Sequence, residues 1–346
     1  MMSNKREAYW DNLKCVLMLL VVIGHAAEEY ITIPFWRGVH LFIYSFHMPV
    51  FVFVSGYWHN KHKQPWKRIL FLTSIGLLFR FVVLAMRIFI ANDPSFSLMD
   101  INDISWFMFA LAAYAAIVWI FKEVQSSSLL LISLVFSIFV GYDTSLGLQF
   151  QKTVAHLPFF LLGILLKEKD NVKSLFQSFA QRKTVSSGIV ILTGIFCASV
   201  IYVDTLKGNH NLSDVLNRIL WNFSYDAYSP RWGGAVRLVW YVMSFVVGAA
   251  FCSLIPRKQF LHASTIGQHT IQIFFWHRII QYVLSGIGID KKLMNTLGGQ
   301  ICWIVLSAGI FWVTSTKLFS FPLKQIDEMI NGSNIACCDN HKLPGG

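Results

Sequence analysis

Residues 11–25 read DNLKCVLMLLVVIGH, an apolar segment that begins with a carboxylate and ends with a histidine. A helix rises about 1.5 Å per residue, so His25 lies roughly 21 Å beyond Asp11, inside a hydrocarbon core ~30 Å thick. Asp11, Lys14, Met18 and His25 share one helical face because three, four and seven residues separate them. An ionisable residue at that depth indicates a functional site, although a hydrogen-bonded structural histidine would give the same pattern.

The composition indicates a polytopic membrane protein. Of the 346 residues, 55% are hydrophobic and 14% are charged, whereas soluble proteins average about 25% charged residues. The net charge of +11 comes from Lys and Arg in short loops, where they set topology, so we expect no nucleic-acid partner. The six cysteines show neither metal nor disulfide spacing. We therefore predict free thiols and no metal site.

Hydropathy predicts an all-α membrane bundle of about ten transmembrane helices. The predicted spans are 12–28, 37–58, 69–91, 104–121, 129–141, 154–166, 185–203, 235–255, 266–288 and 297–319. The spans 129–141 and 154–166 are short for a crossing, so we expect them to extend past the apolar run, to tilt, or to be buried among other helices.

Charge sorts the connecting loops into two sets. Loops rich in Lys and Arg, such as 59–68, alternate with loops that carry acidic residues, and the positive-inside rule places the basic set and both termini in the cytoplasm. We predict one transmembrane domain over 1–325, a polar cytoplasmic tail over 326–346, and a multi-pass location in the plasma (inner) membrane. The long external loop 204–234 is rich in Trp, Tyr, Asn and Asp, which suits either sugar binding or an interfacial aromatic belt.

The second span carries a second polar stripe. Within WRGVHLFIYSFHMPVFVFVSGYW, at 36–58, the stripe consists of Arg37, His40, Tyr44 and His47. Spacings of three, four and three predict one helical face, and Pro49 allows a kink. Two striped neighbouring helices can pair face to face and enclose a hydrated cavity, or simply pack together.

Further charged and histidine residues lie in other spans. In the third span, Arg80 either pairs with the external acids Asp93, Asp100 and Asp103 or lines the cavity. The cluster HNKHKQPWKR at 59–68 could bind lipid head groups or a phosphorylated cofactor, or only set topology. The ninth span places His269, Gln272 and Trp276 on one face, with His277 and Arg278 beyond them.

Several familiar catalytic motifs are missing from the sequence. There is no P-loop, GxSxG elbow, HExxH or paired CxxC, which argues against ATP-driven transport and metal-dependent hydrolysis. A histidine in a membrane cavity can instead act as general base towards a hydroxyl.

At these residues the chain resembles the acyltransferase-3 family of integral-membrane O-acyltransferases, in particular the branch similar to fucose 4-O-acetylases. The matching stretches follow the family's order over nearly the whole chain. They are YWDNLKCVLMLLVVIGH, FIYSFHMPVFVFVSGYW, WKRIL, SWFMFAL at 105–111, LPFFLLGILLKE at 157–168, GGAVRLVWY at 233–241 and STIGQHTIQIFFWH at 264–277.

The resemblance implies about ten helices and transfer of an acyl group, usually acetyl from cytoplasmic acetyl-CoA, to a hydroxyl of a cell-envelope glycan. His25 matches the family's essential first-helix histidine, and His47 belongs to its second-helix motif. Asp11 and Lys14 match an Asp-x-x-Arg motif, with Lys14 where many members have Arg. Lysine cannot make the planar two-point contact of arginine.

Together, the residues and the resemblance predict a membrane O-acetyltransferase that acts on a glycan or glycolipid, with acetyl-CoA as co-substrate and no permanently bound cofactor. The predicted catalytic residues are His25, His47 and Asp11; those for acetyl-CoA are Lys14, Lys67 and Arg68; those for the acceptor are Arg37, His40, Tyr44, Arg80 and Trp106. Direct transfer and an acetyl-histidine intermediate both stay open. The alternative function is a carrier or exporter of a small sugar or anionic solute, in which the stripes line a translocation path.

Overall fold

The structure, a computed structural model, describes residues 8–88, 103–145, 148–169, 182–260 and 262–332, and every regular element within these ranges is helical. The main helices are α1 (Ala8–Glu28), α2 (Pro34–Tyr44), α3 (His47–Tyr57), α4 (Trp66–Met86), α5 (Trp106–Ile120), α6 (Ser126–Val140), α7 (Leu148–Glu168), α9 (Lys183–Lys207), α10 (Asn211–Leu220), α11 (Gly233–Leu254), α13 (Thr270–Gly286), α15 (Leu297–Thr314) and α16 (Leu323–Asn331). Short helical turns are η2 (Tyr225–Ala227), α12 (Ala263–Ile266), α14 (Ile289–Leu293) and η3 (Lys317–Ser320).

Each predicted span coincides with a helix or a helix pair, which confirms the all-α membrane bundle. Within the described residues, six helical segments are long and apolar enough to cross a membrane, and α5 and α6 are shorter apolar helices. The short predicted span 154–166 extends upstream past its apolar run, because α7 begins at Leu148.

The second predicted span corresponds to one apolar segment, Pro34–Tyr57, long enough to cross a membrane. The kink that Pro49 allows is a full break into two helices, α2 and α3, which meet at Ser45 and Phe46. Phe46 leaves the helical conformation with φ −145°. The cause lies in Pro49, whose ring would clash with the carbonyl four residues earlier in a continuous helix. That carbonyl belongs to Ser45, and it accepts a hydrogen bond of 3.0 Å from the hydroxyl of Ser244 on α11. The break therefore lies one turn before the proline.

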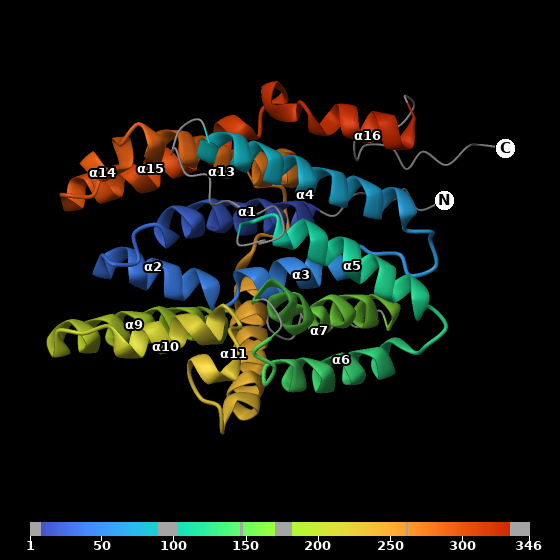
Figure 1. Ribbon diagram of the computed structural model, residues 1–346, viewed down its shortest axis with the longest axis horizontal. Helices are drawn as coiled ribbons and strands as arrows, with labels where there is room; N and C mark the ends of the chain where they lie inside the picture. Colours follow the sequence, from blue (N-terminus) through green and yellow to red (C-terminus); the bar gives the residue numbers. More distant parts are fainter. Residues whose placement is uncertain (1–7, 89–102, 146–147, 170–181, 261, 333–346) are drawn as a thin grey trace.

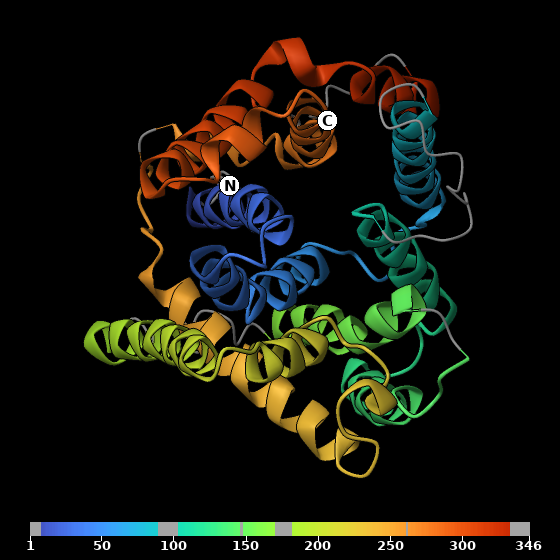
Figure 2. The same ribbon diagram turned by 60° about the vertical axis from the view of Figure 1, so that its left-hand side comes forward.

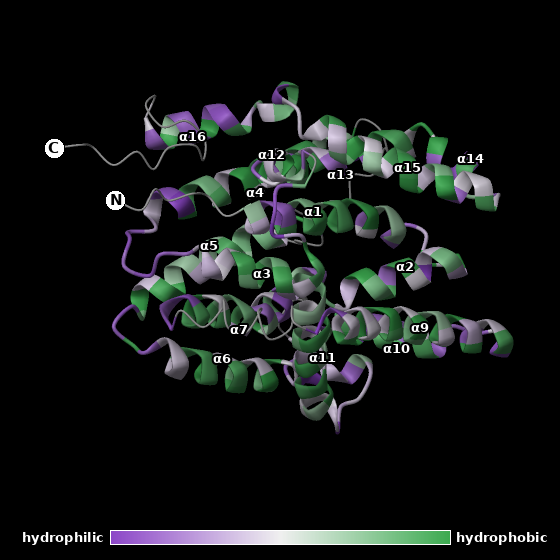
Figure 3. Cartoon of the chain, turned by 180° about the vertical axis from the view of Figure 1, so that it is seen from behind, coloured by the Kyte–Doolittle hydropathy of each residue, from purple (hydrophilic) through white to green (hydrophobic). Residues whose placement is uncertain are grey.

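Most helices run along the long axis of the molecule, and α11 crosses them steeply (Figure 1). The connections α3–α4 and α5–α6 lie at one end with α16, whereas α14, the start of α2 and the α9–α10 connection lie at the other end. Hydrophilic residues gather at these connections and apolar residues cover the helices between them (Figure 3). The described basic connections α3–α4 and α5–α6 thus lie at the end opposite the connections α1–α2 and α13–α15, which carry acidic residues. The sidedness of the loops stays a prediction.

The helices α1 and α3 lie in the interior of the bundle, with α13 and α15 on one side and α4–α7 on another (Figure 2). Both are far more buried than α9 or α15. At one end of α1, the Asn12 amide donates to the carbonyls of Pro256 and Lys258 at 3.0 and 2.8 Å. The first helix is therefore anchored to the connection that follows α11.

Further predictions concern the domain boundary and the cysteines. The predicted domain boundary at residue 325 lies inside α16, which packs against α4. Cys15, Cys197, Cys252 and Cys302 are free thiols, as predicted. Cys337, Cys338, Asp93 and Asp100 lie outside the described residues.

Glycines set the close approach of α3 to α7. A Cβ added at Gly56 would lie 2.0 Å from the carbonyl oxygen of Phe160, and one at Gly163 would lie 2.3 Å from that of Phe53. Both neighbours are backbone atoms in packed helices, so they cannot move aside without separating the helices. Small residues allow such contacts in membrane bundles.

We predict that Gly56→Ala lowers the free energy of unfolding by ~1–3 kcal/mol because it overpacks the α3–α7 contact. Thermal unfolding of the purified protein in detergent measures the change. Gly188→Ala is the matched control, since nothing lies within 4 Å of a Cβ at that helical glycine. Equal stability of the two variants would contradict the predicted contact.

Candidate active site

His25 opens into a cavity where α1 meets α2, α5, α7 and α13. The residues that line it are His25, Glu28, Tyr44, His47, Met48, Asp103, Ile104, Trp106, Phe107, Lys152, His156, Leu220, Trp221, Phe274, Arg278 and Tyr282. We call this space the histidine cavity. Four predicted site residues line it: His25, Tyr44, His47 and Trp106. Asp11, Lys14, Arg37, His40, Lys67, Arg68 and Arg80 lie elsewhere.

His25 is oriented by a carboxylate one helical turn away. Its Nδ1 lies 2.9 Å from Oε2 of Glu28 on α1, and the Tyr44 hydroxyl donates to the same carboxylate oxygen at 3.2 Å. Since an ionised carboxylate only accepts hydrogen bonds, Nδ1 of His25 carries the proton and Nε2 has the free lone pair. This arrangement is suited to general-base chemistry. Glu28 was not among the predicted site residues, although its i, i+3 spacing from His25 was a usable signal.

The predicted stripe Arg37–His40–Tyr44–His47 reaches the histidine cavity only through Tyr44 and His47, whose rings stay in contact across the helix break with centroids 4.6 Å apart. Arg37 turns to α10, where it donates to the Ser213 hydroxyl at 2.8 Å and pairs with Asp214 at 3.4 Å. His40 stacks behind Tyr44 with ring centroids 3.8 Å apart. These two predicted substrate residues therefore support the wall of the histidine cavity from behind.

An aromatic wall holds a buried lysine in the histidine cavity. The Lys152 ammonium, on α7, lies 3.9 Å from the ring centroid of Trp221 and 5.6 Å from that of Trp106. Trp221 also stacks on Tyr44 with the ring planes 4° apart. Trp221 belongs to the predicted aromatic loop 204–234. Lys152 was not predicted, because it precedes the apolar run 154–166 and lies on the part of α7 that extends upstream of it.

Ion pairs tie other helices to this cavity. Arg80 is buried on α4 and donates to Asp103 at 2.7 Å. Of its two predicted roles, pairing with an acid is the one observed, because Asp103 lines the cavity and Arg80 does not. Arg278 on α13 pairs with Glu29 at 2.9 Å and donates to the His25 carbonyl at 3.1 Å.

The residues of the ninth span that lie near His25 are not those of its predicted polar face. Gln272 donates to the carbonyls of Thr314 and Thr316, both at 2.6 Å, and Trp276 donates to the carbonyl of Phe321. His277 instead lies beside His25, with ring centroids 5.5 Å apart. The predicted face of α13 therefore packs against the end of α15, and the next residues reach the site.

A second cavity of ≈ 320 Å³ lies along α1 on the side of the basic loop 59–68. Its lining residues are Lys14, Phe51, Val54, Ser55, Trp58, Arg68, Phe71, Leu72, Phe107, Met108, Leu111, Thr270, Ile271 and Phe274. We call it the basic cavity. Lys14 pairs with the buried Asp11 at 2.9 Å, while Lys67 is exposed and lines neither cavity. Asp11 is remote from His25 and holds Lys14.

Positive charge is concentrated at the mouth of the basic cavity. Nδ1 of His59 lies 3.4 Å from Nη1 of Arg68, and the Lys167 ammonium lies over the ring of Trp58. Burial, together with the charges of Arg68 and Lys167, lowers the pKa of His59 from 6.5 to about 4. Such a site favours an anionic ligand.

Comparison with known proteins identifies the class. An all-helical membrane bundle with a histidine–carboxylate pair in one cavity and cationic residues in a second suits group transfer from an anionic donor. The model of the acyltransferase domain family matches residues 7–316. The chain belongs to this family of membrane acyltransferases.

Relatives with curated descriptions match only a short segment. The nodulation protein NolL of Sinorhizobium fredii and that of Mesorhizobium japonicum are each 41% identical over 59 residues. The aligned segment covers 16% of this chain and 16% of each relative. No solved structure matches the chain. The fucose 4-O-acetylase branch stays a prediction.

The contact between Lys152 and Trp221 should be measurable by a double-mutant cycle. We expect Trp221→Leu to lower the free energy of unfolding. The decrease should be ~1–2 kcal/mol smaller in the Lys152→Met background, because the cation–π contact is already absent there. Denaturant unfolding of the four proteins gives the coupling. Identical penalties in the two backgrounds would show that the ammonium and the indole do not interact.

His59 should make stability depend on pH. Its folded pKa lies below 6.5, so the unfolded chain binds the proton more readily, and the free energy of unfolding falls as pH decreases from about 6.5 to about 4. Unfolding midpoints across this range, compared with His59→Gln, measure the contribution. The variant should show a flatter profile; an unchanged slope would exclude His59 as its source.

Proposed function

We propose that the protein is a plasma-membrane O-acetyltransferase that moves an acetyl group from cytoplasmic acetyl-CoA to a sugar hydroxyl of a cell-envelope or exported polysaccharide. One observation carries the proposal: His25, oriented by Glu28, faces one cavity, while Lys14 and Arg68 face an adjoining cavity nearer the basic loop. A donor and an acceptor can thus approach the same histidine from opposite sides.

Acetyl-CoA would bind in the basic cavity. Its phosphates would contact Arg68 and Lys14, with the exposed Lys67 adding charge at the rim, because cationic side chains attract phosphate. Asp11 is a positioning residue here, since its ion pair fixes the Lys14 ammonium. The pantetheine arm would then extend along α1 towards His25.

The acceptor would enter the histidine cavity from the other side. The faces of Trp221, Trp106 and Tyr44 offer apolar surfaces against which a sugar ring can pack, and all three line the cavity. Arg80 and His40 stand behind this wall, and Arg37 lies further back. We therefore assign these three residues to the support of the acceptor site.

In the reaction, Nε2 of His25 accepts the proton of the sugar hydroxyl as the oxygen attacks the thioester carbonyl carbon. Glu28 stabilises the resulting imidazolium. The Lys152 ammonium and Arg278 line the same cavity and offer positive charge to the tetrahedral oxyanion. The carbon–sulfur bond then breaks, and the CoA thiolate takes the proton from His25. His47, held by a hydrogen bond to the Ile43 carbonyl at 2.8 Å, supports the wall beside His25.

Release of free CoA by the protein in nanodiscs tests the proposal. With acetyl-CoA and an envelope-glycan extract, wild type should release CoA only when glycan is present, and His25→Ala should lower the rate by ~10²–10⁴-fold through loss of the general base. Glu28→Gln should also lower it, because a neutral amide stabilises the imidazolium poorly.

The matched control is His62→Ala, which removes an exposed loop histidine and should keep the wild-type rate. Thermal unfolding verifies that each variant is folded. A wild-type protein that releases no CoA, yet moves sugar or anionic solute across sealed vesicles, would overturn the enzyme proposal in favour of a carrier.

A further inference from the structure

Two phenylalanines form the boundary between the cavities. Among the described residues, only Phe107 and Phe274 line both the histidine cavity and the basic cavity. Phe107 lies in the first turn of α5 and Phe274 in the second turn of α13, and both side chains are buried. Their ring centroids are 5.6 Å apart and the planes are inclined by 48°.

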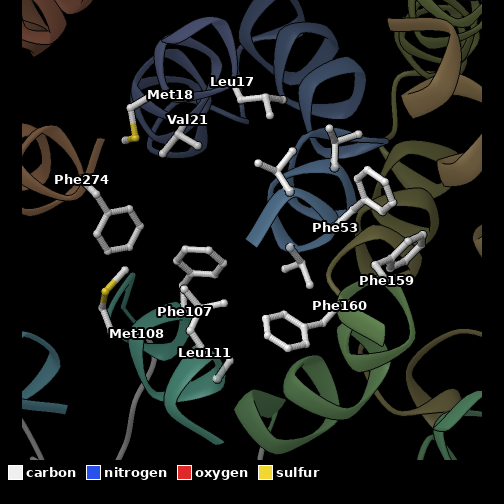
Figure 4. Packing of buried hydrophobic residues seen from close by; sticks show 14 of the residues in the cluster. Leu17, Met18, Val21, Phe53, Phe107, Met108, Leu111, Phe159, Phe160 and Phe274 are labelled. Carbon is white, nitrogen blue, oxygen red and sulfur yellow. The ribbon is translucent and has the colours of Figure 1, made fainter. Parts of the chain in front are cut away.

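The two rings approach each other from different helices. Figure 4 shows Phe274 extending from α13 towards Phe107 and Met108 of α5, with Met18 and Val21 of α1 alongside. Phe107 is further held by an edge-on contact with Phe51, whose ring centroid lies 5.6 Å away. The two rings that both cavities share are therefore packed against each other.

The catalytic histidine lies directly behind this boundary. The rings of Phe274 and His277 are 6.1 Å apart, and those of His277 and His25 are 5.5 Å apart. Nε2 of His277 is buried and has no hydrogen-bond partner among the described residues. His277 thus links Phe274 to His25, although His277 itself lines neither cavity.

We propose that Phe107 and Phe274 form a selectivity gate that admits the thioester end of the donor to His25 and restricts the size of the acyl group that follows. The inference rests on the proposed acyl transfer, because it assigns a role in choosing the donor for that reaction. Rotation of the rings opens a narrow apolar passage. A two-carbon acyl group passes readily, and each further methylene needs a larger displacement of the rings.

Labelling of an introduced thiol tests the gate independently of catalysis. Met48 lines the histidine cavity only, so Met48→Cys places a thiol beyond the gate. A membrane-impermeant thiol reagent is added to sealed vesicles from the side on which Lys14 and Arg68 lie, and mass spectrometry reports modification at position 48. We expect slow labelling with both phenylalanines present and at least several-fold faster labelling after Phe274→Ala or Phe107→Ala.

Phe275→Ala is the matched control. Phe275 follows Phe274 on α13. Its ring packs against that of Phe79 on α4, with ring centroids 5.9 Å apart, and it lines neither cavity. The more conservative Phe274→Leu covers the case in which the alanine variant fails to fold. Equal labelling of position 48 in folded gate variants and in the control would overturn the gate.

Acyl-chain preference is the second measurement. The ratio of CoA release from butyryl-CoA to that from acetyl-CoA should rise by about tenfold or more in Phe274→Ala, a change typical of one or two methylenes in an apolar passage. An unchanged ratio alongside active acetyl transfer would refute the gate and leave the proposed function standing. Faster labelling without CoA release from any thioester would refute the proposed function and leave the gate standing.

Discussion

A charged side chain buried in a membrane bundle must lie close to a partner, and the structure around the histidine cavity depends on this constraint. A bare guanidinium in lipid costs ~2.5–3.5 kcal/mol even on the most lenient insertion scale. Arg80 therefore pairs with Asp103, and Arg278 pairs with Glu29. These contacts join α4 to the start of α5 and α13 to the end of α1. His25 is thereby held between helices whose relative positions are set by charge pairing.

The break between α2 and α3 shapes the same site. Because Pro49 prevents a continuous helix, the carbonyl of Ser45 turns to Ser244 of α11. Residues on both sides of the break, Tyr44 and His47, line the cavity, whereas the preceding turn of α2 contacts α10. A single proline thus couples the geometry of the cavity wall to the position of α11.

The first helix connects two sites of different chemistry. Lys14 lines the basic cavity and His25 the histidine cavity, about 17 Å apart along the helix axis at 1.5 Å per residue. Between them the helix is apolar, and Phe107 and Phe274, which line both cavities, pack against each other beside it. A reaction that needs an anionic donor on one side and a hydroxyl on the other can therefore be organised around one helix.

The sequence by itself determined the all-helical membrane bundle. Hydropathy and helical periodicity are local properties, so they can be read from residues that are neighbours in the chain. It also marked His25, Lys14 and Arg68, whose charges stand out within or beside apolar spans. Only the tertiary structure decided that Lys152 shares a cavity with His25 and Glu28. Glu28 lies one turn from His25 on the same helix, whereas Lys152 lies on α7 and its role arises from contacts between helices far apart in the chain. Such contacts depend on how side chains pack across the bundle, which local sequence patterns do not specify.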